Sequence, residues 1–179
     1  MTSYRSRHSA DCSTRVTLGF LLILPLVLFV IGRIAVGIGF TQDVGGRLKR
    51  AADANSIALA ETELQAALEG MASRGCTAGR SHIIWYTPAC DVGFWHGNIE
   101  DAAAELKAFP EDADALTISN QLMKLRETLL DDGTTVSVTL PPNIAIFPSQ
   151  AAWGGSALCL ILLAILGGGI AVVALDARP

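Results

Sequence analysis

The sequence lacks charged side chains over a long stretch near its start. No Asp, Glu, Lys or Arg occurs over residues 16–32, and apolar residues resume after Arg33 as far as residue 40. A helix of about 20 residues crosses the hydrocarbon core of a bilayer and pairs its own backbone groups there. The stretch therefore predicts a membrane helix over 16–40, with a mild kink near Pro25 and with Arg33 extending towards the nearer head groups.

A second uncharged stretch covers residues 153–175. A buried helix of a soluble protein would carry polar residues along one face, and this stretch presents no such face. It predicts a second membrane helix, with Trp153 at the membrane–water boundary. Because neither stretch contains a carboxylate, a proton relay through them is excluded. For the first stretch the alternative is a signal peptide cleaved near Ala35-Val36-Gly37, although the apolar run is long for that class.

The short motifs that mark common active sites are also absent. The sequence contains no glycine-rich phosphate loop, no nucleophile elbow around a serine and no HExxH pair. Adjacent acids such as Glu100 and Asp101 are more simply read as surface residues than as an acid–base pair. We therefore predict that the chain is not an enzyme, has no catalytic residues and needs no metal or cofactor.

Basic tracts are missing as well. The middle segment, residues 41–152, holds eight Lys and Arg against fifteen Asp and Glu, so its net charge is −7. It would repel phosphate backbones, so nucleic acid is not an expected partner. The arginines before the first stretch favour cytoplasmic tails over 1–15 and 176–179, which places the middle segment outside the bacterial cytoplasmic membrane. Arg47, Lys49 and Arg50, just past the first stretch, favour the opposite orientation.

The middle segment predicts a small, mainly helical α+β domain. Residues 47–73 are rich in helix formers with apolar residues at helical spacing, which predicts one long helix capped by Gly75. Gly45-Gly46 indicates a bend before it, and whether this helix continues from the membrane helix is left open. The expected elements that follow are a cysteine- and aromatic-bearing loop over 74–98, helices over 99–109 and 112–130, a turn at Asp131-Asp132-Gly133 and a strand over 134–140. The predicted fold class is thus a membrane protein in which two transmembrane helices flank this extracytoplasmic domain.

Two cysteines, Cys76 and Cys90, lie in the predicted loop. In an extracytoplasmic domain they predict a disulfide, which would close about 15 residues and contribute roughly 3 kcal/mol. His82 and His96 each follow one of these cysteines by six residues, so a Cys2His2 zinc site is the alternative. We favour the disulfide, because this spacing matches no common zinc module.

Aromatic and small residues supply the remaining candidates. The aromatic residues that flank the cysteines form either core beneath the loop or a patch that binds a protein partner, and they are Trp85, Tyr86, Phe94 and Trp95. Pairs of small residues allow membrane helices to approach one another closely. The pairs expected to pack the two helices together or onto a partner are Ala35 with Gly39 and Ala164 with Gly168. The expected partners are membrane lipid and other membrane proteins of an envelope complex.

A longer pattern joins the first membrane helix to the residues after it. Its elements are Phe20, Leu24-Pro25-Leu26, Gly32-Arg33, Arg47-Leu48, Ala51-Ala52-Asp53-Ala54 and Ala58-Leu59-Ala60. Over residues 15–60 the chain resembles TadE/TadG-like proteins, the pseudopilin-like membrane components of tight-adherence pilus and secretion systems. The resemblance implies a long continuous helix and assigns the family motif to Leu24, Pro25, Arg33, Ala51, Ala52 and Asp53.

The chain departs from that family in two respects. Many members carry a glutamate early in the apolar run, which guides pilin assembly, and this chain has Gly19 near that place. A second membrane helix is also not typical of the family. The resemblance therefore implies a protein that stays in the membrane as a non-enzymatic structural or assembly component of a cell-envelope machine. The alternative is an accessory subunit of a large respiratory or transport complex, while tails this short disfavour a sensor.

Overall fold

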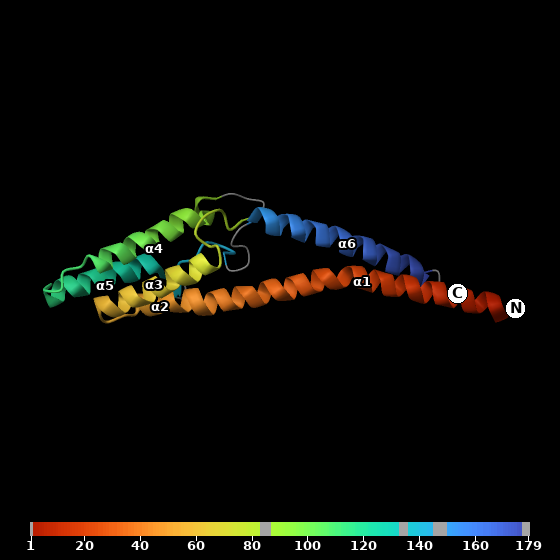
Figure 1. Ribbon diagram of the computed structural model, residues 1–179, viewed down its shortest axis with the longest axis horizontal. Coiled ribbons are helices and arrows are strands. Elements are labelled where there is room, and N and C mark those ends of the chain that lie inside the picture. The colour runs from red at the N-terminus through yellow and green to blue at the C-terminus, as the bar shows by residue number, and fades with distance from the viewer. Residues whose placement is uncertain (1, 83–86, 133–135, 145–149, 177–179) are drawn as a thin grey trace. The chain divides into compact units, whose positions relative to one another are not determined.

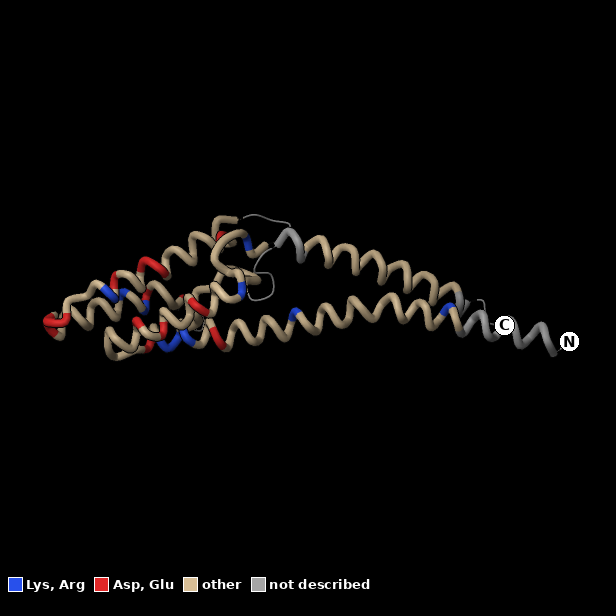
Figure 2. The backbone as a smooth tube through the Cα atoms, viewed as in Figure 1, with Lys and Arg blue, Asp and Glu red and all other residues tan. Residues whose placement is uncertain are grey.

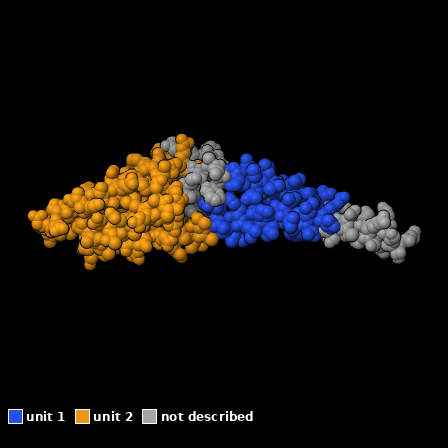
Figure 3. All heavy atoms as spheres, in the orientation of Figure 1, with its two compact units in different colours: residues 1–34, 151–179 blue, residues 35–150 orange. Residues whose placement is uncertain are grey.

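The computed structural model describes residues 2–82, 87–132, 136–144 and 150–176 and divides into two compact units (Figure 1). Unit 1 comprises residues 1–34 and 151–179, and unit 2 comprises residues 35–150; Figure 3 colours them separately. Unit 1 consists of apolar helix, whereas unit 2 is a small helical domain with its own hydrophobic core.

Two helices, α1 (Thr2–Phe40) and α6 (Gln150–Asp176), supply unit 1. Both are long and apolar enough to span a membrane, as the sequence predicts, and only 11% and 6% of their most apolar stretches are buried. Pro25 lies inside α1 without ending it. Figure 2 shows most of the Lys, Arg, Asp and Glu residues in unit 2, and the large side chains exposed along residues 16–39 and 154–173 are almost all apolar.

The predicted bend at Gly45-Gly46 is wrong. A π-helical turn, η1 (Thr41–Gly45), and helix α2 (Gly46–Ala52) follow α1 directly, and both glycines have right-handed helical torsions. Val44 and Leu48 are fully buried on one face of this segment, so packing holds the glycines in the helix. The helical backbone therefore runs without interruption from Thr2 to Ala52, which resolves the alternative that the sequence leaves open.

The single helix predicted over 47–73 is instead two helices. α2 ends at Ala52, and α3 (Ile57–Ser73) begins after a short turn. Ser56 has extended backbone torsions, and its side-chain oxygen accepts a hydrogen bond from the Leu59 amide at 3.4 Å. The Asp-Ala-Asn-Ser sequence of the turn carries side chains that hydrogen-bond nearby backbone groups and so compete with helix formation.

The end of α3 follows the prediction. Gly75 has a positive φ of 68°, and its amide donates to the Ala72 carbonyl at 3.1 Å. The Cys76 amide then donates to the Met71 carbonyl at 2.9 Å, which completes a Schellman motif. Only glycine adopts this backbone conformation without steric cost, so the cap is encoded locally.

The second half of unit 2 differs from the prediction at several boundaries. Its elements are η2 (Pro88–Cys90), α4 (Val92–Lys107), α5 (Ala115–Leu129), β1 (Leu130–Asp132) and β2 (Val136–Val138). α4 begins before residue 99, because Asp91 caps it by accepting from the Phe94 amide at 3.0 Å. The expected turn at Asp131-Asp132 is strand, since β1 pairs antiparallel with β2 and Leu130 lies opposite Val138. Residues 133–135 of the predicted turn and strand lie outside the described residues.

The core of unit 2 lies between these helices. α3 packs against α2 and α4, and α5 packs against α2. The fully buried side chains with the largest volumes are Phe40, Leu48, Leu64, Met71, Leu106 and Ile144. The domain is therefore mostly helical with one two-stranded sheet, in agreement with the predicted class.

Ion pairs join the helices around this core. The Glu63 carboxylate of α3 contacts Arg50 at 2.9 Å and Arg47 at 3.5 Å, and the Glu63 side chain is only 15% exposed. Lys124 of α5 contacts Glu105 of α4 at 2.6 Å and lowers the pKa of that carboxyl by hydrogen bonding. The Lys and Arg partners in these pairs are exposed, so each pair adds little stability by itself.

Replacing Ser56 by alanine removes the acceptor at the start of α3. We expect the free energy of unfolding of the full-length chain in mild detergent to fall by about 1 kcal/mol, the usual value of an N-cap. Ser73→Ala is the matched control, because the Ser73 hydroxyl only donates to the Gly70 carbonyl within the same helix. Thermal unfolding followed by circular dichroism compares the two, and equal losses would contradict the capping role of Ser56.

Candidate functional site

A hollow of about 650 Å³ opens on the surface of unit 2 beside the start of α4. Most of its lining is apolar, with three prolines and two aromatic rings. The lining residues are Pro88, Ala89, Asp91, Phe94, Trp95, Asn98, Thr139, Leu140, Pro141 and Pro142. They come from η2, from the first turns of α4 and from the segment after β2, so distant parts of the sequence meet here.

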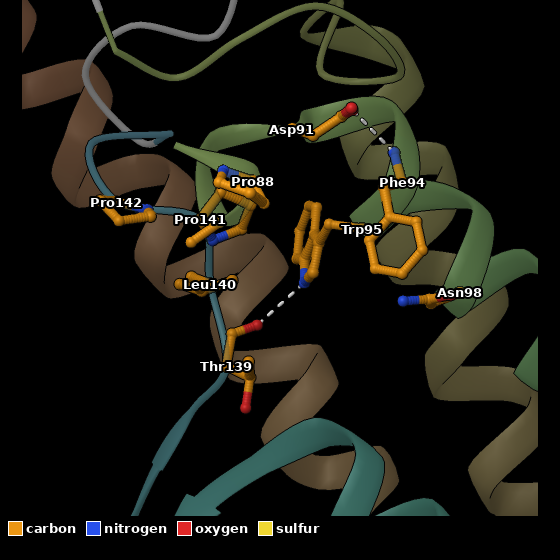
Figure 4. Close-up of a pocket in the computed structure, with 10 residues that line it drawn as sticks. Pro88, Asp91, Phe94, Trp95, Asn98, Thr139, Leu140, Pro141 and Pro142 are labelled. Carbon is orange, nitrogen blue, oxygen red and sulfur yellow. Dashed lines mark hydrogen bonds between the residues drawn. The ribbon is translucent and has the colours of Figure 1, made fainter. Parts of the chain in front are cut away.

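Trp95 holds the two sides of the hollow together. Its indole Nε1 donates to the Thr139 carbonyl at 2.9 Å, which ties α4 to the segment that follows β2. In the view of Figure 4 the indole stands between Pro88 and Pro141 on one side and the Phe94 ring on the other. Trp95 is half-buried, whereas Phe94 is 69% exposed. The predicted aromatic patch is therefore divided between one residue that supports the domain and one that faces outwards.

Local sequence explains why this wall forms. Pro88 begins η2, where its missing amide and fixed φ are tolerated. Asp91 then caps α4, and Val92 donates from its amide to the Gly79 carbonyl at 3.0 Å. Gly79 has a φ of 96°, which glycine adopts readily. This hydrogen bond joins the loop after α3 to the start of α4. The prolines and aromatic rings near it line the hollow.

Only part of the predicted aromatic set reaches this hollow. Phe94 and Trp95 line it from α4 rather than from a loop, because the cap at Asp91 extends the helix to include them. Trp85 and Tyr86 lie outside the described residues. The Pro141-Pro142 pair was missed as a site feature, although a proline pair after a strand is a visible signal of an exposed, rigid segment.

The predicted disulfide is absent. Cys76 and Cys90 are both buried and are not joined to each other. The Cys90 sulfur lies 3.0 Å from the Thr87 hydroxyl, and the Cys76 sulfur lies 3.8 Å from the Arg74 carbonyl oxygen. The two thiols therefore pack as small side chains within separate local turns.

The alternative zinc site is not assembled either. Within the described ranges, no three His, Cys, Asp or Glu side chains converge as metal ligands would. His82 contacts Asn143 at 3.2 Å, whereas His96 is buried and its Nδ1 lies 3.4 Å from Glu100. The two histidines thus serve different local contacts, and the repeated Cys-x5-His spacing does not bring its members together.

Unit 1 contains a second candidate site, the close approach of α1 and α6. A Cβ atom added to Gly19 would lie 2.7 Å from the Gly167 carbonyl oxygen, and one added to Gly167 would lie 2.7 Å from the Gly19 carbonyl oxygen. Both distances are well inside van der Waals contact, so only glycine fits at either position. Ala171, one turn further along α6, also lies against Gly19. The two helices therefore pack backbone to backbone at this point.

This contact uses different residues from those predicted. Gly39 and Gly168 have open space around the position of a Cβ atom, and Ala35 is exposed. Ala164, the fourth predicted residue, is only partly buried. The pair of α6 that packs against α1 is Gly167 with Ala171, three residues further along the helix than the predicted pair. Sequence spacing alone does not distinguish the two registers, since Gly167, Gly168 and Gly169 are consecutive.

The residues of the family motif take structural positions. Leu24 and Pro25 are exposed on α1, whereas Arg33 is only 8% exposed and so is covered by protein rather than extended along lipid. Ala51 and Ala52 are buried in the core of unit 2. Asp53 ends α2, and its carboxylate contacts Arg126 of α5 at 2.6 Å. The second part of the motif, Ala51, Ala52 and Asp53, thus lies at the end of α2 and at its junction with α5.

Trp95→Phe tests whether the indole hydrogen bond fastens the hollow. The variant replaces the indole by a smaller aromatic ring and loses the bond to the Thr139 carbonyl, so we expect unfolding to become easier by at least about 0.5–1.5 kcal/mol. Phe94→Ala removes the exposed neighbour and should change stability by less than about 0.5 kcal/mol. Chemical unfolding of the full-length chain in detergent gives both values, and a larger loss for Phe94→Ala would reverse the assigned roles.

Gly167→Leu tests the close helix contact. A leucine there must push α1 and α6 apart, and overpacking of this kind costs about 1–3 kcal/mol. Gly168→Leu adds the same side chain to the same helix at a position with open space, so it controls for the added hydrophobicity. We expect the melting temperature in mild detergent to fall for the first variant only. Identical melting temperatures would show that the glycines do not form the contact in solution.

Comparison with known proteins identifies no relative whose role could be transferred to this chain. No family model, no curated protein and no solved structure matches the chain. The resemblance of residues 15–60 to TadE/TadG-like proteins therefore stays a prediction, and the function has to be argued from the two sites described above.

Proposed function

We propose that the chain is a two-pass protein of the bacterial cytoplasmic membrane that serves as a non-enzymatic structural or assembly component of a cell-envelope machine. α1 and α6 anchor it in lipid, unit 2 lies on the extracytoplasmic side, and both tails lie in the cytoplasm. Its role is of the kind that TadE/TadG-like proteins have in pilus and secretion systems.

The proposal rests on the exposed apolar surface of α1 and α6. Large hydrophobic side chains such as Phe20, Leu28 and Ile165 are more than half exposed along both helices. Soluble proteins rarely leave such continuous apolar surface in water, because its burial is strongly favourable. Lipid is the solvent that covers it while the helices satisfy their own backbone groups.

The contact at Gly19 supports an anchored component rather than one extracted into a filament. Many of the TadE/TadG-like proteins that the chain resembles carry an assembly-guiding glutamate near this place. In this chain the Gly167 carbonyl of α6 lies where a side chain of residue 19 would begin. The second helix, α6, thus occupies the space that a glutamate side chain at residue 19 would need. The absence of the glutamate and the presence of the second helix are therefore consistent with each other.

The uninterrupted helix from Thr2 to Ala52 also supports this role. The helical segment that follows the apolar stretch supplies Val44, Leu48 and Ala51 to the core of unit 2. The resemblance to TadE/TadG-like proteins implies the same continuity. The working parts are therefore this helix and the surface of unit 2.

A second candidate function is an accessory subunit of a large respiratory or transport complex. It is favoured by the open space around Gly39, Gly168 and Gly169. Small residues that are not used in the α1–α6 contact are suited to close packing against helices of a partner. The two candidates differ in the proteins that should accompany the chain.

Affinity capture of the full-length chain distinguishes them. Cells are solubilised in a mild detergent, and co-purifying proteins are identified by mass spectrometry beside a two-pass control protein with the same tag. We expect motor or platform proteins of a pilus or secretion apparatus. Enrichment of oxidase or transporter subunits instead would replace the first candidate with the second.

The orientation is checked in the same cells. Leu116 is 67% exposed on α5, so Leu116→Cys should react with a membrane-impermeant maleimide in intact spheroplasts. Cys12 in the N-terminal tail should react only after permeabilisation. The opposite pattern would place unit 2 in the cytoplasm and contradict its extracytoplasmic assignment.

A further inference from the structure

We infer that the hollow around Trp95 contacts the head-group layer of the bilayer that holds α1. The occupant is phospholipid at the membrane surface rather than a soluble ligand. This inference rests on the proposed function, since it requires α1 to lie in lipid. It assigns Phe94 and the neighbouring prolines a role that neither the anchor nor the core of unit 2 requires.

The first step is the level of the hollow along α1. Within unit 2, the last outward-facing apolar residues of α1 are Val36 and Ile38, which are 46% and 54% exposed, whereas Phe40 is 1% exposed. The lipid-facing surface therefore ends near Ile38. Gly45 follows seven residues later, about 10 Å along a helix that rises 1.5 Å per residue.

The hollow lies at the level of Gly45. The Leu140 side chain, which lines the hollow, comes within 3.9 Å of a Cβ position at Gly45. A bilayer has a hydrocarbon core of about 30 Å within a total of about 40–45 Å, so each head-group layer is roughly 5–8 Å thick. A surface about 10 Å beyond the last lipid-facing residue therefore lies roughly 2–5 Å outside that layer, a gap that an aromatic side chain can bridge.

Other contacts place the start of α4 at the same end of unit 2. Arg74, just after α3, forms an ion pair with Asp43 of η1. A Cβ position at Gly93, in the first turn of α4, lies 3.9 Å from Ala78 in the loop after α3. Figure 1 shows the same arrangement, with the start of α4 and the start of α2 at one end of unit 2 and the α2–α3 and α4–α5 turns at the other.

The chemistry of the hollow suits this layer. Phe94 protrudes, Trp95 offers a half-buried indole, and Pro88 and Pro142 are exposed, so the surface is apolar and stiff. Asp91 is the charged residue in the lining, and its carboxylate is engaged in capping α4. Aromatic rings favour the membrane–water boundary, where an apolar body and a polar edge are both accommodated.

The opposite end of unit 2 has contrasting chemistry. The turn between α4 and α5 carries Glu111, Asp112 and Asp114. Figure 2 shows acidic residues at that end of unit 2. Ionised carboxylates are costly to remove from water, so these acids favour the aqueous side of the domain. The two ends therefore differ in the way expected of a domain with one end on the membrane and the other in water.

Lipid-depth quenching tests this contact. Phe94→Cys and Leu116→Cys are made in a full-length background with Cys12→Ser and Cys159→Ala, and each is labelled with the fluorophore NBD. Leu116 is the matched control, because its exposure of 67% equals that of Phe94 closely and it follows the acidic turn. In vesicles of phosphatidylcholine and phosphatidylglycerol with a head-group nitroxide lipid, we expect loss of fluorescence at position 94 and none at position 116.

A third probe, at Ile161→Cys on α6, separates this inference from the proposed function. Quenching of the Ile161 probe by a nitroxide deep in the acyl chains, without quenching at position 94, would overturn the lipid contact and leave the hollow to a protein partner. Absence of quenching at both positions would show instead that the chain is not inserted, and so would defeat the proposed function itself. Equal quenching at positions 94 and 116 would also overturn the inference, because the contact would then not be specific to the hollow.

Discussion

The arrangement of this protein depends on removing the apolar surface of α1 and α6 from water. Both helices are uncharged over lengths that match a bilayer core, and their side chains are mostly exposed. Two helices of this kind do not bury each other, and lipid would cover the remainder in the arrangement that we propose. The contact at Gly19 and Gly167 adds specificity to this pair through close packing rather than through polar groups, which are costly in hydrocarbon.

Unit 2 is built on the continuation of α1. The buried face of η1 and α2 supplies Val44, Leu48 and Ala51 to the core, and α3 folds back against it after the turn capped by Ser56. Asp53 ends α2 and joins it to α5 through Arg126. A domain of this size has a modest core, so the helix caps and the contacts between helix ends contribute a substantial share of its stability. The outcome is a compact helical unit whose loop-bearing end holds the Trp95 hollow.

The two sites suggest a division of labour. The glycine contact fixes how the anchors pair, and the glycines that it leaves open are available to partner helices. The Trp95 hollow gathers rings and prolines on the surface of unit 2, where we infer that it contacts lipid head groups. No catalytic constellation is needed for either role. Both roles are consistent with the proposed function as a membrane-anchored assembly component.

The sequence by itself determined the elements that local physics controls: two apolar helices long enough for a membrane, the mainly helical middle domain, and the Gly75 cap, where only glycine fits the backbone. Tertiary packing decided the rest. It kept Gly45-Gly46 helical by burying their neighbours, turned Asp131-Asp132 into strand by pairing them with β2, and chose Gly167 over Gly168 as the contact. Each of these outcomes depends on a partner distant in sequence, and local propensity carries no information about such a partner.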